Sequence, residues 1–229
     1  MLIRNLDLLF DDPLRFFLLV ALVAFALMVG ITIHEFSHAL VADRLGDATA
    51  RRLGRLSLNP LAHLDPLGTI MLFLVGFGWG KPVPVNAYNL QNGRRSMALV
   101  AAAGPISNLI AVFLFALPIR LNLIGSQDAL LFGSSFVNAS GLVLSLLAVL
   151  IFYNIVLAVF NLLPIFPLDG SNILLGVLPE DAARSYVRLA RYGPVLLILV
   201  IMLDYMFGLH ILGRIMDPAI RYIGSLAGV

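Results

Sequence analysis

ITIHEFSHAL, residues 31–40, places His34 and His38 four positions apart in an apolar stretch, with Glu35 next to the first histidine. On an α-helix, four positions are slightly more than one turn, so both imidazoles face the same way and can share one metal ion. Glu35 lies about 100° round such a helix and can reach a water on that ion. This H-E-x-x-H pattern is typical of zinc hydrolases, which need neutral imidazole ligands and a carboxylate that is free to take a proton.

The composition around this motif is that of an integral membrane protein. The 229 residues are 60% hydrophobic and 12% charged, and the mean hydropathy is +0.98. A net charge of +2, with the basic residues spread over loops, indicates no nucleic-acid partner. The chain has no cysteine, so His, Asp or Glu must hold any metal. Ionisable groups inside a span usually indicate function, although these three polar groups could also satisfy one another between packed helices.

Apolar runs predict an all-α polytopic membrane protein forming one membrane-embedded domain over residues 1–229, with no removable signal peptide. A bilayer span needs ~20 apolar residues. Runs of this length begin near residues 14, 96, 141 and 192, so we expect about four transmembrane helices, the last over 192–213 after an amphipathic turn from residue 179. Residues 67–80 are too short to span and rich in glycine, which favours a re-entrant or interfacial segment. The Pro-Val alternation in residues 81–85 predicts either a short β-like edge near the cytoplasmic face, able to align an extended peptide, or a stiff surface loop.

Basic residues predict the orientation in the cell membrane. The loop after the first span carries Arg44, Arg51, Arg52 and Arg55, which marks the cytoplasmic side under the positive-inside rule. His34 lies in the last third of that span. The candidate site is therefore expected toward the cytoplasmic side.

NLLPIFPLDG, residues 161–170, supplies the natural third ligand. Its two prolines break the helical hydrogen bonds within an apolar region, and such broken backbone is tolerated only beside protein or a water-filled cavity. A carboxylate in that place, Asp169, is typical of a binding site. Asp204 and His210 rank below it, and His63 is predicted to be a loop histidine bonded to backbone. Asn108, in the stretch AGPISN at 103–108, is a candidate either for function or for linking two helices.

Taken together, HEFSH at 34–38 and NLLPIFPLDG at 161–170 resemble the site-2 protease family of intramembrane zinc metalloproteases, in the same order along the chain. AGPISN resembles a third element of that family. The resemblance covers roughly residues 14–178. It implies that His34, His38 and Asp169 bind one Zn²⁺ per chain, that Glu35 is the catalytic carboxylate, and that Asn161, with Asn108 a weaker candidate, contacts substrate. Accessory PDZ and CBS domains of other members are not recognisable here.

The resemblance also implies the reaction and its partners. A zinc-activated water, with Glu35 as base, would hydrolyse peptide bonds of substrate proteins that are themselves transmembrane helices in the lipid bilayer. Two other functional classes fit the sequence less well. A metal transporter should show ionisable residues from one side of the membrane to the other and commonly an internal repeat, and neither pattern is present in the sequence. An inactive scaffold would have no need for Glu35 beside the histidine pair.

Overall fold

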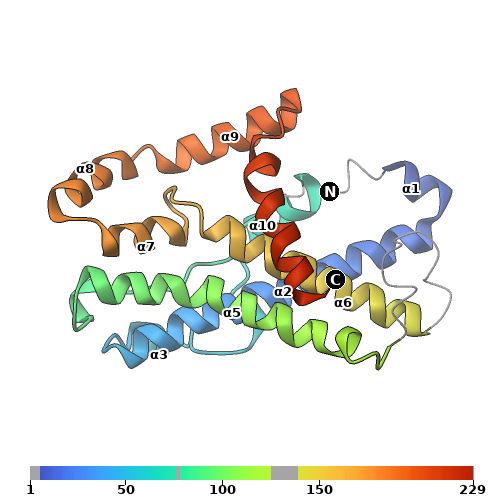
Figure 1. Cartoon of the computed structure of the whole chain (residues 1–229), viewed down its shortest axis with the longest axis horizontal. Coiled ribbons are helices and arrows are strands. Elements are labelled where there is room, and N and C mark those ends of the chain that lie inside the picture. Colours follow the sequence, from blue (N-terminus) through green and yellow to red (C-terminus); the bar gives the residue numbers. More distant parts are fainter. Residues whose placement is uncertain (1–5, 76–77, 125–138, 229) are drawn as a thin grey trace.

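Three long helices form the centre of the protein (Figure 1). The computed structural model describes residues 6–75, 78–124 and 139–228, and these residues contain helices and no sheet. The central helices are α2 (Pro13–Arg44), α5 (Arg94–Arg120) and α6 (Ala139–Asn161), with the short α1 (Leu6–Asp11) before them. Each central helix is long and apolar enough to cross a bilayer. The chain is therefore a multi-pass, all-α membrane protein, as predicted.

Small residues let the central helices approach closely. Lipid tails are as apolar as leucine, so helices in a bilayer associate through close packing and polar contacts rather than through the hydrophobic effect. Ala26 on α2 and Ala116 on α5 are fully buried. At Gly30 of α2, a Cβ atom would lie 2.7 Å from Leu157 Cδ1 on α6, so a larger residue would push these two helices apart.

The segment after α2 leaves the bundle and returns to the same place. It contains α3 (Thr49–Arg52), the 3₁₀ turn η2 (Pro60–Ala62) and α4 (Pro66–Val75). An isolated antiparallel bridge joins Leu64 to Gly80, and the Cα of Gly68 packs against the Trp79 backbone. Residues 64–68 and 79–80 are thus side by side, and the re-entrant path of the chain between them stays a prediction.

Residues 81–85 are neither helix nor strand and form no strand ladder with any other described residue, so the predicted short β-like edge is absent here and the segment is a loop. The Lys81 N–H donates to the His63 carbonyl at 2.8 Å. His63 is fully buried, and its Nε2 bonds the Ser57 carbonyl at 2.7 Å, which confirms it as a loop histidine bonded to backbone. The segment then continues through η3 (Ala87–Asn89) into α5.

The proline-containing break delivers Asp169 to the bundle. α6 ends at Asn161, and α7 (Asp169–Val177) folds back along α5 (Figure 1). Gly170 makes this return possible, because a Cβ there would lie 2.2 Å from the Leu162 carbonyl oxygen. Asp169 is consequently the first residue of a helix that packs against α5.

The C-terminal region differs from the predicted single last span over 192–213. The predicted amphipathic turn is an 11-residue helix, α8 (Glu180–Ala190), and it meets α9 (Gly193–Phe207) at a bend of 61°. These two helices count as a fourth span only if they are taken together. α9 ends early because Gly208 adopts a left-handed conformation and the Asp204 carboxylate accepts the Ile211 N–H, which begins α10 (Ile211–Ala227).

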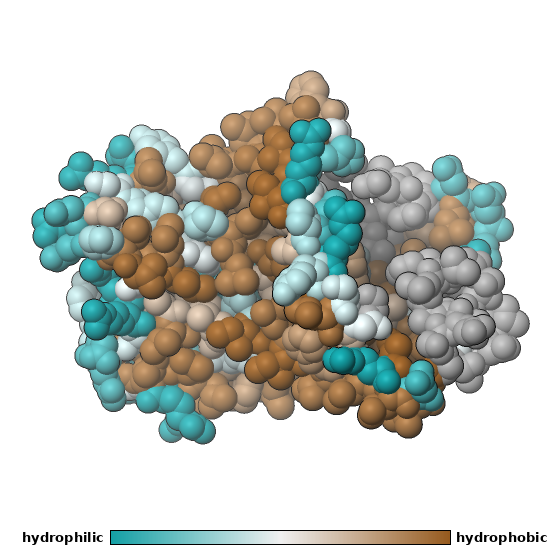
Figure 2. Space-filling view, viewed as in Figure 1, coloured by the Kyte–Doolittle hydropathy of each residue, from teal (hydrophilic) through white to brown (hydrophobic). Residues whose placement is uncertain are grey.

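α10 crosses back over the central helices (Figure 1). It buries Met216 and Ala227 in a core cluster with side chains of α5 and α6, and it exposes Arg214 and Arg221. In Figure 2, hydrophobic residues dominate the middle of the visible face, and hydrophilic residues gather at the end formed by α3 and α8 and along α10. This distribution suits a protein whose mid-section faces lipid.

Candidate active site

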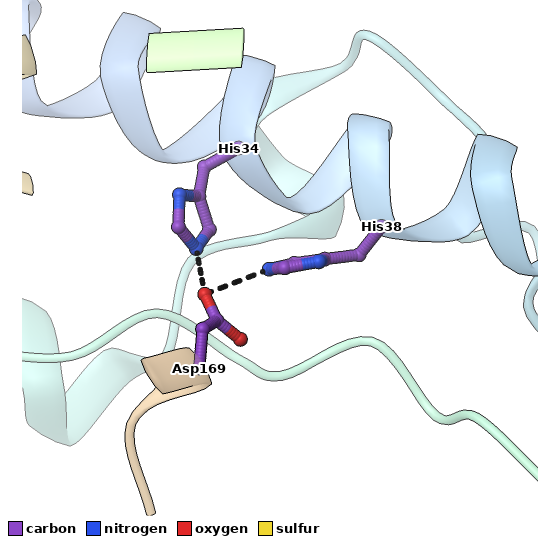
Figure 3. A group of neighbouring side chains, drawn as sticks. All are labelled: His34, His38 and Asp169. Carbon is purple, nitrogen blue, oxygen red and sulfur yellow. Dashed lines mark ion pairs between the residues drawn. The ribbon is translucent and has the colours of Figure 1, made fainter. Parts of the chain in front are cut away.

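His34 and His38 point from α2 toward the first turn of α7, where they meet Asp169 (Figure 3). Asp169 Oδ2 lies 3.0 Å from His34 Nε2 and 3.2 Å from His38 Nε2. Both histidines are buried, and the potential ligand atoms of the three residues lie within 4.8 Å of one another. The three residues that the sequence singled out as ligands are thus brought together by α2 and α7, which are more than a hundred residues apart in the chain.

The second nitrogen of each ring has its own partner. His38 Nδ1 lies 2.7 Å from the Val100 carbonyl oxygen, which can only accept, so this nitrogen carries the ring proton. His34 Nδ1 lies 2.6 Å from Asn108 Oδ1. In the neutral form of each imidazole, a proton on Nδ1 leaves Nε2 unprotonated and facing Asp169, which is the form a histidine needs to bind a metal through that nitrogen.

The surroundings of Asp169 Oδ2 fit a metal ion. With both imidazoles in the neutral form that binds a metal, this buried oxygen has no hydrogen-bond donor among the described residues. Three lone pairs that converge without a donor repel one another unless a cation lies between them. Ligands at ~2.0–2.1 Å in tetrahedral geometry are about 3.3 Å apart, close to the separations seen. Two neutral imidazoles and one carboxylate are a ligand set that suits zinc and leaves a fourth position open.

Gly104 of α5 closes the other side of this group. A Cβ at this position would lie 2.5 Å from His38 Nε2 and 2.6 Å from His34 Nε2. The absence of a side chain therefore keeps clear the space in front of both nitrogens.

Glu35 lines a cavity of about 600 Å³ together with the three candidate ligands. Its Oε2 accepts the backbone N–H of Val83 at 3.0 Å, so the 81–85 segment fixes the carboxylate beside the histidines. The cavity wall continues over apolar side chains of α9, including Leu197 and Ile198. A carboxylate beside a candidate metal centre, within a largely apolar cavity, can exchange protons with a water or a reacting group.

The two predicted substrate-contacting asparagines lie in different settings. Asn161 lines the cavity, and its amide nitrogen donates to the Leu157 carbonyl at 2.9 Å. Asn108 is fully buried, bonds His34 and joins α2 to α6, which matches the helix-linking alternative. Asp204 and His210 lie at the junction of α9 and α10, and neither belongs to the metal-binding group found among the described residues.

Three features of the site are not predictable from the motifs. Asn154 of α6 is fully buried and accepts a hydrogen bond from Asn108 at 2.8 Å. Arg55 is buried and donates to the carbonyls of Lys81 and Pro82, which holds the 81–85 segment in place. The Val83 N–H is a backbone group and has no residue signature. Of these, only Asn154, as a polar residue in an apolar run, carried a sequence signal.

Comparison with known proteins identifies the family. The model of "Peptidase family M50" matches residues 22–202, most of the chain and every candidate ligand. The chain belongs to peptidase family M50. This is the site-2 protease family that the motifs indicated. An M50 relative in Bacillus subtilis, named "Putative zinc metalloprotease YwhC", is 39% identical over 73% of this chain and 74% of its own length.

Two mycobacterial proteins extend the comparison. "Putative zinc metalloprotease Rip2" of Mycolicibacterium smegmatis is 31% identical over 83% of this chain and 70% of its own length. The protein of the same name in Mycobacterium tuberculosis is 30% identical over 82% and 70%. No solved structure gave a significant match. As an M50 member with these relatives, the chain is a membrane-embedded zinc metalloprotease.

Proposed function

We propose that this M50 protease hydrolyses peptide bonds of transmembrane protein substrates, with one zinc ion held by His34, His38 and Asp169 and with Glu35 as the general base. One observation carries the proposal: the Nε2 atoms of two imidazoles and a buried carboxylate oxygen without a hydrogen-bond partner converge beside Glu35 in one cavity. A metal held for transport or for structure alone would give Glu35 no task at this position.

The division of labour follows from the chemistry of the groups. Zinc with an open coordination position lowers the pKa of water to ~7 and polarises a carbonyl group. Glu35 takes the proton from the attacking water and delivers it to the leaving amine nitrogen. The Val83 N–H keeps one oxygen of Glu35 in place, so the other is free to face the reacting groups.

An extended substrate fits the cavity better than a helical one. Peptide bonds in a helix are shielded by their own hydrogen bonds, so a transmembrane substrate has to unwind locally before hydrolysis. Pro82, Val83 and Val85 line the cavity, which supports alignment of an unwound stretch along this segment. Asn161 lines the same cavity, which supports a role in hydrogen-bonding that stretch.

The arginine distribution supports a site facing the cytoplasm. α3 with Arg51 and Arg52, the start of α5 with Arg94, and α8 all lie at the same end of the bundle in Figure 1. This is the end at which α2 terminates, a short distance after His38. Under the positive-inside rule that end is cytoplasmic.

Glu35→Gln tests the proposal. Wild-type protein and the variant are expressed at equal levels in a bacterial host, and new peptide termini within transmembrane segments of membrane proteins are quantified by mass spectrometry. We expect the variant to retain zinc. Its cleavage rate should fall by ~10²- to 10⁴-fold, the contribution typical of a general base. Equal cleavage by the two proteins would exclude Glu35 as the base, and new termini confined to soluble loops would exclude intramembrane hydrolysis.

A further inference from the structure

Asn154 lies inside α6, one of the three apolar spans, and its side chain has no exposed surface. An amide in such a place is costly unless its polar atoms are bonded. Its Nδ2 donates to the Leu150 carbonyl at 2.8 Å, and its Oδ1 accepts from Asn108 Nδ2, also at 2.8 Å. Asn154 is thus a bonded link between α6 and α5, and the reaction outlined above gives it no part.

Each of the two side-chain amides in this link can adopt only one orientation. The Leu150 carbonyl can only accept, so Asn154 must turn its nitrogen toward Leu150 and its oxygen toward Asn108. That oxygen and the Gly30 carbonyl, 3.0 Å from Asn108 Nδ2, occupy both hydrogens of the Asn108 nitrogen. Turning either amide round would set oxygen against oxygen, which decides the orientation on chemical grounds.

The orientation of the Asn108 amide in turn determines which nitrogen of His34 carries a proton. With its nitrogen committed, Asn108 presents its oxygen to His34 Nδ1 at 2.6 Å. An oxygen that only accepts requires a proton on Nδ1, and Nε2 is then free to bind a metal. His38 needs no such chain, because a backbone carbonyl faces its Nδ1 directly. An amide can offer either oxygen or nitrogen, so for His34 the choice must be imposed from beyond Asn108.

We propose that Asn154 is a positioning residue that selects the metal-binding tautomer of His34 by fixing the orientation of the Asn108 amide. The inference rests on the proposed zinc site and adds a residue that touches neither substrate nor metal. Loss of a hydrogen-bond partner behind a histidine ligand typically costs 10- to 100-fold in metal affinity. Because the Gly30 carbonyl still holds Asn108 when Asn154 is replaced, we expect about tenfold, the lower end of that range.

Three variants separate positioning from packing. Asn154→Leu keeps a similar volume and removes the acceptor, so only the Gly30 carbonyl still opposes a turned Asn108 amide. Asn154→Asp keeps an acceptor oxygen facing Asn108 in either protonation state and should retain near wild-type zinc affinity. Thr32→Val is the matched control, because it removes a side-chain hydrogen bond to the Met28 carbonyl of 2.6 Å without touching this chain of amides.

The experiment measures two quantities in detergent-purified protein. Zinc affinity comes from competition with a chelator, and the His34 tautomer comes from ¹⁵N NMR of histidine rings in zinc-free protein, assigned by the signal lost in His34→Gln. We expect wild type, Asn154→Asp and Thr32→Val to hold the proton on Nδ1, and Asn154→Leu to show a tautomer mixture with about tenfold weaker zinc binding.

Each alternative result has one meaning. An unchanged tautomer and affinity in Asn154→Leu would overturn the inference, as would a wild-type His34 protonated on Nε2, which needs no folded variant. Wild-type protein that binds no zinc would instead overturn the proposed function. The tautomer of zinc-free protein would still report on Asn154, so the two failures are distinguishable.

Discussion

The carboxylate of Glu35 accepts a hydrogen bond from the backbone N–H of Val83, 3.0 Å away. The bond joins the motif helix α2 to a segment 48 residues further along the chain. The donor is a backbone group, so the proposed base is held in place by the main chain of another segment. This segment is therefore part of the proposed catalytic arrangement as well as a wall of the cavity.

Val83→Pro removes this donor. The prolines at 82 and 84 already favour an extended backbone, so a third is compatible with the local conformation. A hydrogen bond to a charged group contributes about 1.5–3 kcal/mol, which corresponds to roughly 10- to 100-fold in turnover. We expect cleavage to fall by that factor while zinc content is unchanged. Val83→Ala is the control, since it keeps the N–H, and an equal loss in both variants would contradict a role for the backbone donor.

Val85→Pro tests the alignment of substrate along the same segment. It removes the next N–H on that side of the segment and leaves the bond to Glu35 intact. If substrate pairs with this segment, initial cleavage rates at low substrate concentration should fall by several-fold, with zinc content unchanged. Rates equal to wild type would rule out pairing at this position.

Gly104→Ala should displace the metal. Its Cβ would lie 2.5–2.6 Å from the nitrogens of both histidines, far inside contact distance, so the rings or α5 must move. We expect zinc affinity to fall by at least about tenfold, since disturbing only the outer partners of a ligand already costs 10- to 100-fold. Gly213→Ala in α10 is the control, because a Cβ there has no neighbour closer than 3.6 Å. Full zinc content in Gly104→Ala would show that this space is not needed.

Asp47 is expected to make stability depend on pH. It is buried at the end of α2 and joins that turn to the 86–89 segment. Burial alone would raise the pKa of Asp47, but hydrogen bonds from Asn89, Thr49 and Asn86 outweigh it and hold the pKa below its usual value of 3.8. A lowered pKa in the folded state means that this stabilisation is present above pH 3.8 and is lost as the pH falls through the folded-state pKa.

Thermal unfolding in detergent measures this contribution. Asp47→Asn should melt at a lower temperature than wild type at pH 7, by the equivalent of about 1–3 kcal/mol. The difference should shrink once the pH is below 3.8. A difference that stays constant down to pH 3 would contradict the role assigned to the ionised carboxylate.

Short sequence motifs predicted most residues of the candidate site. The residues that the motifs missed depend on contacts between helices that are far apart in the sequence. His34, Glu35 and His38 follow from helical spacing, and Asp169 follows from a proline-broken stretch in an apolar region. The role of Asn154 depends on which helix packs beside which, because the same amide could equally have bonded only its own backbone. The position of Asn154 in the sequence does not reveal which helix will pack beside it.

The C-terminal region shows a different limit. The apolar run over 192–213 predicted one helix, but a left-handed Gly208 and the Asp204 carboxylate end α9 at Phe207 and start α10. The polar positions Arg214, Asp217 and Arg221 recur at helical spacing, which is a readable signal for an amphipathic helix. Hydropathy averaged over a span hides such a signal, because the run stays apolar across the turn.

The zinc content of detergent-purified protein tests the central claim most directly, with Asp169→Ala and the exposed Asp217→Ala handled identically. The proposed site predicts about one zinc per chain in wild type and in Asp217→Ala, and a clear loss in Asp169→Ala, because two neutral imidazoles remain without their carboxylate partner. Folded wild-type protein without zinc, or equal zinc in all three proteins, would contradict the three-ligand centre.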